Sequence, residues 1–476
     1  MIPNTENLLK VISGTNQWWK TGKLPVGFIK PIKRFAFHEA MKVFLHPDIR
    51  RMAILTGARR IGKTTIMYQM IESLLEKGIE PKRIVYISFD HPLLKLYRFD
   101  EILDVYSQNI YPGNDVYFFF DEIQYASDWD VWLKTLYDIN PQCRAVATGS
   151  ASPVLAGKAS ESGVGRWTVI SIPTLSFYEY CALTGIEAPE LGSELKPSNL
   201  RILPRQEQVM IFQKLSPLLR HFNHYLTAGG FPELALSGDE YYAQRIMRDD
   251  VVDKVLKRDI PALYNIRSIG DLEKIFLYLC YNSSGIISME AISRELNGVS
   301  RPTVEKYIQY LESANLIYVS NPIDIRGKEI LKSRPKIYIA DTAIRNAIIM
   351  QDDILTNPTE MEIIAETAVY KHIRAFYYRM SAAIGYYRQS GKDNEIDIVV
   401  EYAGNRILAE VKYREQYSLG EKAAIVSEAG NATSALLITK KEDDFGPLQV
   451  NPYVYRIPAY AFLYLLGHAE KNTYAS

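Results

Sequence analysis

The segment from Met52 to Lys77 constrains the fold more than any other part of the chain. An apolar run, MAILT, leads into GARRIGKTT, and a helical pattern, TTIMYQMIESLLEK, follows. This order of strand, glycine loop and helix matches G-x-x-x-x-G-K-[ST], in which backbone N–H groups and a helix N-terminus surround phosphates. The alternative, a chance match on a glycine loop, does not account for the flanking strand and helix. We therefore expect an ATP-binding loop, formed by Gly57, Ala58, Arg59, Arg60, Ile61, Gly62, Lys63, Thr64 and Thr65.

The residue types in this loop, and in a second motif, indicate hydrolysis. Lys63 would neutralise charge on the β- and γ-phosphates, and the Thr64 hydroxyl would ligate Mg²⁺. The second motif, VYFFFDEIQ, places Asp121 and Glu122 at the C-terminal end of an apolar run, where ligand sites of parallel sheets lie. Asp121 would hold Mg²⁺ through water, and Glu122 would polarise the attacking water. The alternative is a strand that ends in solvated acids.

Two later segments supply further candidates for the same chemistry. ATGSAS ends another apolar run, so Thr148 or Ser150 would reach the γ-phosphate or the attacking water. A simple turn at the end of the strand is the alternative for that segment. Farther on, Arg166 would stabilise transition-state charge on a neighbouring subunit's nucleotide, as an arginine finger does. This role implies a homo-oligomer, with a hexameric ring as one form, and the alternative is a surface arginine.

The pattern between residues 50 and 175 defines the fold class of this part. Short, almost continuous apolar runs alternate with helix-like segments, which is typical of a parallel α/β sheet buried on both faces. A chain of 476 residues is too long for one core and predicts several domains. No apolar stretch is long enough to span a membrane, and no secretory signal is visible. Three separated cysteines fit a reducing cytoplasm, where we expect the protein to act.

The motifs follow one another in an order that resembles a known family. They are TGARRIGKTT, FFFDEIQ, TGSAS, SGVGRW with PTLSFYEY, TAGGFPE and VLKRDI, and together they resemble the AAA+-type ATPases that carry a C-terminal domain of formerly unknown function. The resemblance implies an α/β fold class, in which a P-loop AAA+-type parallel sheet with a helical lid precedes a winged helix and a PD-(D/E)XK nuclease-like α/β domain. The expected parts are an N-terminal segment (1–30), the ATPase core (31–206), the helical lid (207–265), the winged helix (266–345) and the nuclease-like domain (358–476).

The segment from Met289 to Ser320 predicts a helix–turn–helix with a wing. Ser300 would cap the second helix, whose exposed first half is the part that contacts DNA in such folds. Because the formal net charge is zero, DNA binding would depend on a local basic patch. Winged helices also act as packing or oligomerisation modules, which is the alternative. The candidate DNA contacts are Arg301, Thr303, Lys306, Arg326, Lys328, Lys332, Arg334 and Lys336.

The stretch NEIDIVVEYAGNRILAEVKY predicts a hairpin that also carries a metal site. Side chains alternate along a strand, so Glu410 and Lys412 share one face, and the hairpin would bring Asp397 beside them. Glu366 lies among apolar residues on a helix upstream, which is unfavourable for an acid unless it is paired or near a metal. The order Glu366, Asp397, Glu410 and Lys412 matches the PD-(D/E)XK pattern, so all four are catalytic candidates. Asp397 and Glu410 would bind Mg²⁺ or Mn²⁺, while Lys412 would orient the nucleophile. The alternative is a solvated hairpin whose charges pair across the strands.

These expectations combine into one hypothesis about function and one alternative. The first is an enzyme that uses ATP hydrolysis to bind or remodel DNA and cleaves it with a metal ion. Branched, Holliday-junction-like DNA is the suggested substrate, on fold analogy alone. The alternative is a regulatory ATP switch whose terminal domain only binds DNA or a protein partner.

Overall fold

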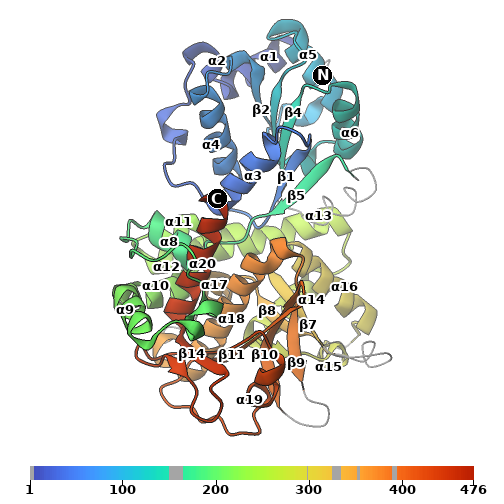
Figure 1. The fold of residues 1–476 in the computed structure, drawn as a ribbon. Helices are drawn as coiled ribbons and strands as arrows, with labels where there is room; N and C mark the ends of the chain where they lie inside the picture. The colour runs from blue at the N-terminus through green and yellow to red at the C-terminus, as the bar shows by residue number, and fades with distance from the viewer. Residues whose placement is uncertain are drawn as a thin grey trace. The chain divides into compact units, whose positions relative to one another are not determined.

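The computed structural model describes residues 5–149, 165–296, 298–323, 334–350, 354–388 and 394–475. The chain divides into two compact units, Met1–Pro173 and Thr174–Ser476 (Figure 1). The boundary lies before the expected end of the ATPase core at residue 206. Residues just after Pro173 belong to the second unit because Leu175 and Phe177 are fully buried in its core.

A five-stranded sheet forms the centre of the first unit, and all its strands are parallel, as the apolar runs predict. Its strands are almost entirely buried, since helices cover both faces. Phe118 and Phe120 face one side, and Phe119 faces the other, where its ring lies 5.5 Å from that of Phe44. The strand order is β2 (Ile84–Ser88), β3 (Tyr117–Asp121), β4 (Arg144–Gly149), β1 (Met52–Thr56) and β5 (Trp167–Ser171). The helices are α1 (Thr5–Thr15), α2 (Trp18–Thr21), α3 (Phe35–Phe44), α4 (Lys63–Glu76), α5 (Phe99–Asn109) and α6 (Trp129–Ile139).

The N-terminal segment covers the edge of this sheet at β2. The Asn16 side chain donates to the carbonyl of Tyr86 across 2.8 Å and accepts from its N–H across 2.7 Å. The indoles of Trp18 and Trp19 both donate to the carbonyl of Ile84, at 3.0 and 2.8 Å. These side chains satisfy backbone groups that an edge strand otherwise leaves open for pairing with another chain.

A nine-stranded mixed sheet runs through the second unit. The segments expected as a winged helix and as a nuclease-like domain share this sheet, because β7 pairs with β9 through Asn321 with Gly385 and Pro322 with Tyr386. The strand order is β13 (Gly446–Pro447), β14 (Val454–Pro458), β12 (Ser434–Thr439), β11 (Asn405–Lys412), β10 (Glu395–Tyr402), β9 (Ala383–Arg388), β7 (Ile317–Pro322), β8 (Lys336–Ile339) and β6 (Gly285–Ile286).

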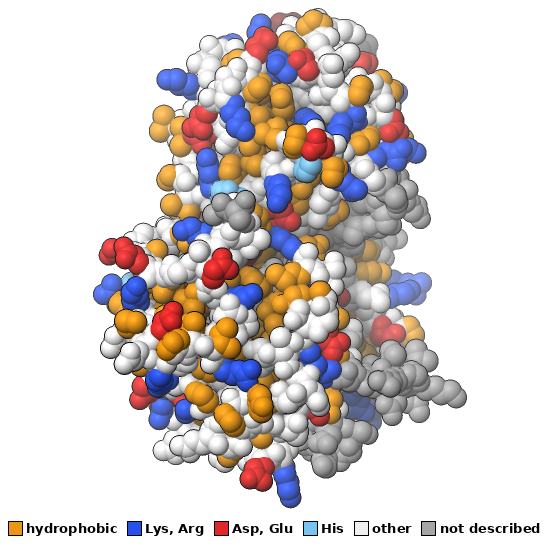
Figure 2. Space-filling model, viewed as in Figure 1, with side chains coloured by type: hydrophobic (Ala, Val, Ile, Leu, Met, Phe, Trp, Pro, Cys, Tyr) orange, Lys and Arg blue, Asp and Glu red, His pale blue; other side chains and the backbone are white. Residues whose placement is uncertain are grey.

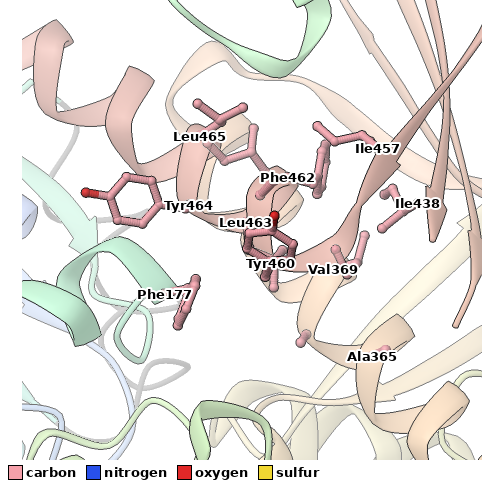
Figure 3. Close-up of a cluster of buried hydrophobic side chains, with 14 of the residues drawn as sticks. Phe177, Ala365, Val369, Ile438, Ile457, Tyr460, Phe462, Leu463, Tyr464 and Leu465 are labelled. Atoms are coloured by element: carbon pink, nitrogen blue, oxygen red, sulfur yellow. The ribbon is translucent and has the colours of Figure 1, made fainter. Parts of the chain in front are cut away.

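Helices surround this sheet and build the largest apolar core of the second unit. Figure 3 shows Phe177 of α8, Ala365 and Val369 of α18 and a run of α20 side chains beside the strand residues Ile438 and Ile457. The helices are α8 (Phe177–Leu183), α9 (Arg205–Leu215), α10 (Leu219–Ala228), α11 (Pro232–Ala235), α12 (Glu240–Ile246), α13 (Ile260–Tyr264), α14 (Ile269–Tyr281), α15 (Met289–Glu295), α16 (Arg301–Ser313), α17 (Thr342–Ile349), α18 (Pro358–Tyr377), α19 (Ala424–Glu428) and α20 (Ala459–Ala475). Among the described residues, no helix combines the length and apolar character that a membrane crossing needs.

Candidate functional site

The loop between β1 and α4 has the backbone shape that a phosphate cradle needs. Gly57 adopts a φ of 147°, and a Cβ there would lie 2.3 Å from Ile61 Cδ1 and 2.5 Å from the carbonyl oxygen of Ile172. Gly62, which precedes α4, has a φ of 92°. Both conformations favour glycine, so the two glycines of the motif are explained by local geometry.

Lys63 is held against this loop. Its ammonium donates to the carbonyl oxygens of Gly57 and Ala58, at 3.0 and 2.9 Å, and the residue is 6% exposed. The cation therefore lies over the loop, where phosphate oxygens bind in this motif.

Asp121 is the centre of a hydrogen-bond network at the C-terminal edge of the sheet. Its Oδ2 accepts from the Thr64 hydroxyl at 2.9 Å and from the Tyr86 hydroxyl at 2.7 Å. Its other oxygen accepts from the Thr148 hydroxyl. Burial and the Asp121 charge both raise the pKa of Tyr86, so that hydroxyl stays protonated and remains a donor. Side chains from α4, β2, β3 and β4 thus converge on one carboxylate.

Thr148 also connects this carboxylate to its neighbour in sequence. The backbone N–H of Glu122 donates to the Thr148 hydroxyl across 3.0 Å. Glu122 has a φ of 50°, which turns the chain sharply directly after Asp121. This bond and this turn fix the backbone of Glu122 directly after Asp121.

One residue near the loop was missed by the sequence reasoning. Arg34 is 8% exposed, and its guanidinium donates to the carbonyls of Ile61 and Pro173, each at 2.8 Å. It links the phosphate loop to the segment after β5. The sequence offers no local signal for this role, because Arg34 follows two lysines in IKPIKRF and resembles a solvated basic stretch.

Arg166 and Ser150 are the other candidate catalytic residues of the first unit. Arg166 forms an ion pair with Asp138, at 2.9 Å, which lowers the pKa of that carboxyl. A role in a neighbouring subunit would require Arg166 to leave this partner. Ser150 lies outside the described residues, so Thr148 is the candidate of that pair that the structure places.

In the second unit, the three acids and the lysine expected at a metal site belong to one cluster. Glu366, Asp397 and Glu410 are 8%, 6% and 6% exposed, respectively. Asp397 lies where the register between β10 and β9 shifts, at a bulge between Ile396 and Val399, and its Oδ2 accepts from the N–H of Val411 at 2.9 Å. Bulges of this kind redirect side chains, often next to functional sites.

Lys336 occupies the middle of this cluster. Its ammonium lies 2.7 Å from Glu366 Oε1, 2.9 Å from Asp397 Oδ1 and 3.4 Å from Glu395 Oε1. We expected Lys336 to contact DNA phosphates. That expectation is wrong, because the side chain is 2% exposed and the carboxylates hold its charge inside the protein.

The protonation of this carboxylate–lysine cluster follows from burial and from these contacts. Burial and the charge of Asp397 raise the pKa of Glu366 to about 7 and that of Glu410 to about 8. Burial alone would raise the pKa of Asp397 too, but the ammoniums of Lys336 and Lys412 hold it below its usual range. Lys412 lies 2.6 Å from Glu410 Oε1.

The residues present do not fit a divalent metal ion. The part of the chain that the structure describes contains no group of three His, Cys, Asp or Glu side chains placed to hold one. The reason is local, because the oxygens of Glu366 and Asp397 that would face a metal ion already face an ammonium. The expected catalytic roles of Glu366, Asp397, Glu410 and Lys412, and the metal ligation by Asp397 and Glu410, therefore stay predictions.

The expected DNA-contacting residues lie on α16 and around β8. Lys306 and Arg334 are exposed. Arg301 is exposed as well but pairs with Glu290 at 2.5 Å and Glu305 at 2.8 Å, so its charge is largely compensated. Thr303 shares a hydrogen bond with the capping Ser300. Arg326, Lys328 and Lys332 lie outside the described residues.

The described residues form no single basic strip on the side drawn in Figure 2. Lys and Arg side chains are interspersed there with Asp and Glu, as the zero net charge of the sequence suggests. Any nucleic-acid contact on this face would therefore depend on a few cations.

Three segments of the chain match family models. Residues 49–181 match a model described as an AAA domain, residues 219–354 match a domain of unknown function (DUF8612), and residues 361–460 match another domain of unknown function (DUF4143). The chain is 26% identical over 304 residues to an uncharacterized protein of Haemophilus influenzae, which covers 63% of this chain and 69% of that protein. It is 27% identical over 295 residues to an uncharacterized protein of Methanocaldococcus jannaschii, and this match covers 61% of this chain and 60% of that protein. The match thus spans 69% of the first relative's length and 60%, less than two thirds, of the second's.

Two solved structures give weaker similarities. The ORC2 protein of Aeropyrum pernix has a TM-score of 0.38 and 11% identity, with 75% of this chain and 98% of that chain covered. The ORC1 protein of the same organism, in complex with DNA, has a TM-score of 0.30 and 12% identity, with 71% and 97% covered. At these scores we draw nothing about function from either structure. The family model and the geometry at Lys63 and Asp121 agree that residues 49–181 carry a P-loop ATPase domain of the AAA type.

Proposed function

We propose that the first unit hydrolyses ATP at the edge formed by the phosphate loop, Asp121 and Thr148. The observation that carries this proposal is the position of the Asp121 carboxylate, which accepts hydrogen bonds from Thr64 and from Thr148. The oxygens of Thr64 and Asp121 are hard ligands that suit Mg²⁺, which would neutralise phosphate charge when bound with ATP. Lys63 binds phosphate oxygens from the loop side.

The residues after β3 would activate water. Glu122 follows Asp121 at a sharp turn, where its backbone N–H donates to the Thr148 hydroxyl. It would accept a proton from the attacking water, while Thr148 keeps the two acids in place. This division of roles predicts that Glu122 affects turnover more than ATP binding.

Phosphate release from ATP by the full chain tests this proposal. Lys63→Ala should abolish binding and turnover together. Glu122→Gln should bind ATP normally but hydrolyse it about 10²–10⁴-fold more slowly. Lys10→Met, at an exposed position of α1, is a matched control that should behave as wild type. Undiminished hydrolysis by Lys63→Ala would show that the loop is not the active site.

We further propose that the chain acts on DNA through the segment around α16. The support is the order α14, β6, α15, α16, β7 and β8, which is that of a winged helix, together with the exposed Lys306 and Arg334. Ser300 caps α16, and Arg301 and Pro302 in its first turn are exposed, in the part where recognition helices contact DNA. The compensated charge of Arg301 makes Lys306 the more important cation on this helix.

Salt-dependent binding to a fluorescent duplex tests this second proposal. Lys306→Ala should weaken binding to all sequences and reduce the slope of log affinity against log salt by about one. Lys10→Ala should leave both quantities unchanged. Equal affinity and slope in the wild type and Lys306→Ala would exclude the α16 contact.

For the part of the second unit that carries Glu366, Asp397 and Glu410, we propose that it binds DNA or a protein partner and does not cleave DNA. Metal-dependent cleavage of branched DNA is supported by the convergence of Glu366, Asp397 and Glu410, but Lys336 occupies the position that a metal ion would need. Incubation with duplex and four-way DNA in Mg²⁺ or Mn²⁺ distinguishes the two. Cleavage by the wild type that is lost in Asp397→Ala would overturn the binding-only proposal.

The ATPase rate measured with and without DNA distinguishes a DNA-processing enzyme from a regulatory ATP switch. If DNA is the partner, duplex or four-way DNA should raise the ATPase rate, and Lys63→Ala should show no rate under either condition. An ATPase rate that DNA does not change, with no DNA binding, favours the switch. We also propose a homo-oligomer, a ring of six being one form, in which Arg166 serves a neighbouring nucleotide.

A further inference from the structure

We infer that Lys336 is the resident cation of the carboxylate cluster in the second unit, and that its ammonium excludes a divalent metal ion from Glu366 and Asp397. This inference goes beyond the proposed function, because it holds whether or not the chain hydrolyses ATP or binds DNA. It explains why residues in the order of a metal-dependent nuclease site form an ion-paired cluster instead.

The Lys336 ammonium has a carboxylate partner for each of its N–H donors. A lysine ammonium carries three N–H donors, and Lys336 faces three carboxylates, those of Glu366, Asp397 and Glu395, at 2.7, 2.9 and 3.4 Å. The Tyr338 hydroxyl, two residues along the same strand face, donates to Glu366 Oε1 at 2.8 Å. The cation and its neighbouring donor are therefore both positioned by strand β8.

Because the cluster is buried, the Lys336 ammonium leaves no room for a divalent ion at the same carboxylates. The side chain of Lys336 is 2% exposed, and those of Glu366 and Asp397 are 10% and 9% exposed. Divalent ions bind carboxylate oxygens at about 2.0–2.6 Å. The same oxygens already contact the ammonium, so an ion placed there would lie beside a second positive charge in a region that water does not screen.

The charges of the cluster show what removal of Lys336 would do. Three buried carboxylates, Glu366, Asp397 and Glu410, face two ammoniums, those of Lys336 and Lys412. Glu410 Oε2 is buried and has no hydrogen-bond partner among the described residues. Without Lys336, Asp397 Oδ1 would lose this donor beside the unpartnered Glu410 Oε2, and carboxylate oxygens of this kind are the ligands that divalent cations prefer.

Lys336→Met tests this inference because methionine keeps much of the side-chain length and removes the charge. Mn²⁺ binding to nucleotide-free full chain is counted by electron paramagnetic resonance. We expect Lys336→Met to bind one more Mn²⁺ per chain than the wild type, and Lys336→Met combined with Asp397→Asn to lose that ion again. A folded Lys336→Met protein that binds no additional Mn²⁺ would overturn the inference.

The wild-type background gives a second test that does not depend on the folding of Lys336→Met. Asp397→Asn and Glu366→Gln, each with Lys336 present, should leave the number of bound Mn²⁺ ions unchanged. A wild-type Mn²⁺ site that Asp397→Asn removes would show that Lys336 does not exclude the metal. Because the readout is metal binding alone, a failure of ATP hydrolysis or DNA binding is recognised separately and leaves this inference standing.

Discussion

Lys336 Nζ donates a hydrogen bond to Asp397 Oδ1 across 2.9 Å, although the two residues lie 61 positions apart in the chain. The contact joins β8, at the end of the segment expected as a winged helix, to β10 of the segment expected as a nuclease-like domain. It places a positive charge where the sequence order alone suggests a metal ion. The charges of the second unit are therefore arranged for internal pairing at the point where catalysis was expected.

Asp397→Asn should destabilise the second unit by about 3–5 kcal/mol, because breaking a buried ion pair leaves the Lys336 ammonium with fewer compensating charges, those of Glu366 and the more exposed Glu395. Urea denaturation followed by fluorescence measures this change. Glu395→Gln is the matched control, since Glu395 contacts the same ammonium at 3.4 Å but its side chain is 35% exposed. Its effect should be well under that of Asp397→Asn, and equal effects would contradict the central role of Asp397.

The second unit should lose stability as the pH rises from about 5 to 8. Glu410 has an ordinary pKa of 4.5, which burial and Asp397 raise to about 8 in the folded protein. Within this window the folded state keeps the proton and the unfolded state releases it, so rising pH favours unfolding by up to about 1.4 kcal/mol per pH unit for this group. Glu366, with a pKa of about 7, adds to the trend at its lower end.

Glu410→Gln provides the control for this pH dependence. The amide does not titrate, so the slope of unfolding free energy against pH should decrease between about 5 and 8. The measurement is urea denaturation of the wild type and the variant at several pH values. Equal slopes would mean that Glu410 is not protonated in the folded state.

Arg34→Met should weaken ATP binding about tenfold, since charged hydrogen bonds contribute about 1.5–3 kcal/mol and this guanidinium supports the phosphate loop at Ile61. Competition with a fluorescent nucleotide measures the affinity. Lys30→Met changes an exposed cation of the same segment and should have no effect. If both variants bind ATP as the wild type does, Arg34 does not position the loop.

The features that can be predicted from the sequence are those that depend on residues close together in the chain. The phosphate loop and the parallel sheet follow from residues that are adjacent in the chain, and the strand ends place Asp121 and Thr148 at one edge. Lys336 was misinterpreted because it lies in a basic stretch, while the acids that bury its charge come later in the chain. Asn16 and Arg34 were missed for the same reason, since their partners are carbonyls of distant residues.

Arg166→Ala should lower the ATPase rate if the chain assembles with Arg166 facing a neighbouring nucleotide. Removing an arginine finger costs about 10³–10⁵ in turnover where one operates. Asp138→Asn is the matched control, because it releases Arg166 from its 2.9 Å ion pair without deleting the arginine. That variant should hydrolyse ATP at least as fast as the wild type.

Mixing two inactive variants distinguishes a role in a neighbouring subunit from a role within the chain. Arg166→Ala retains an intact phosphate loop, and Lys63→Ala retains Arg166, so a mixed oligomer would contain complete sites where the two meet. The ATPase rate of the mixture should therefore exceed the sum of the separate rates. A mixture without added activity, from variants shown by light scattering to co-assemble, would place the function of Arg166 in its own subunit, where it holds Asp138.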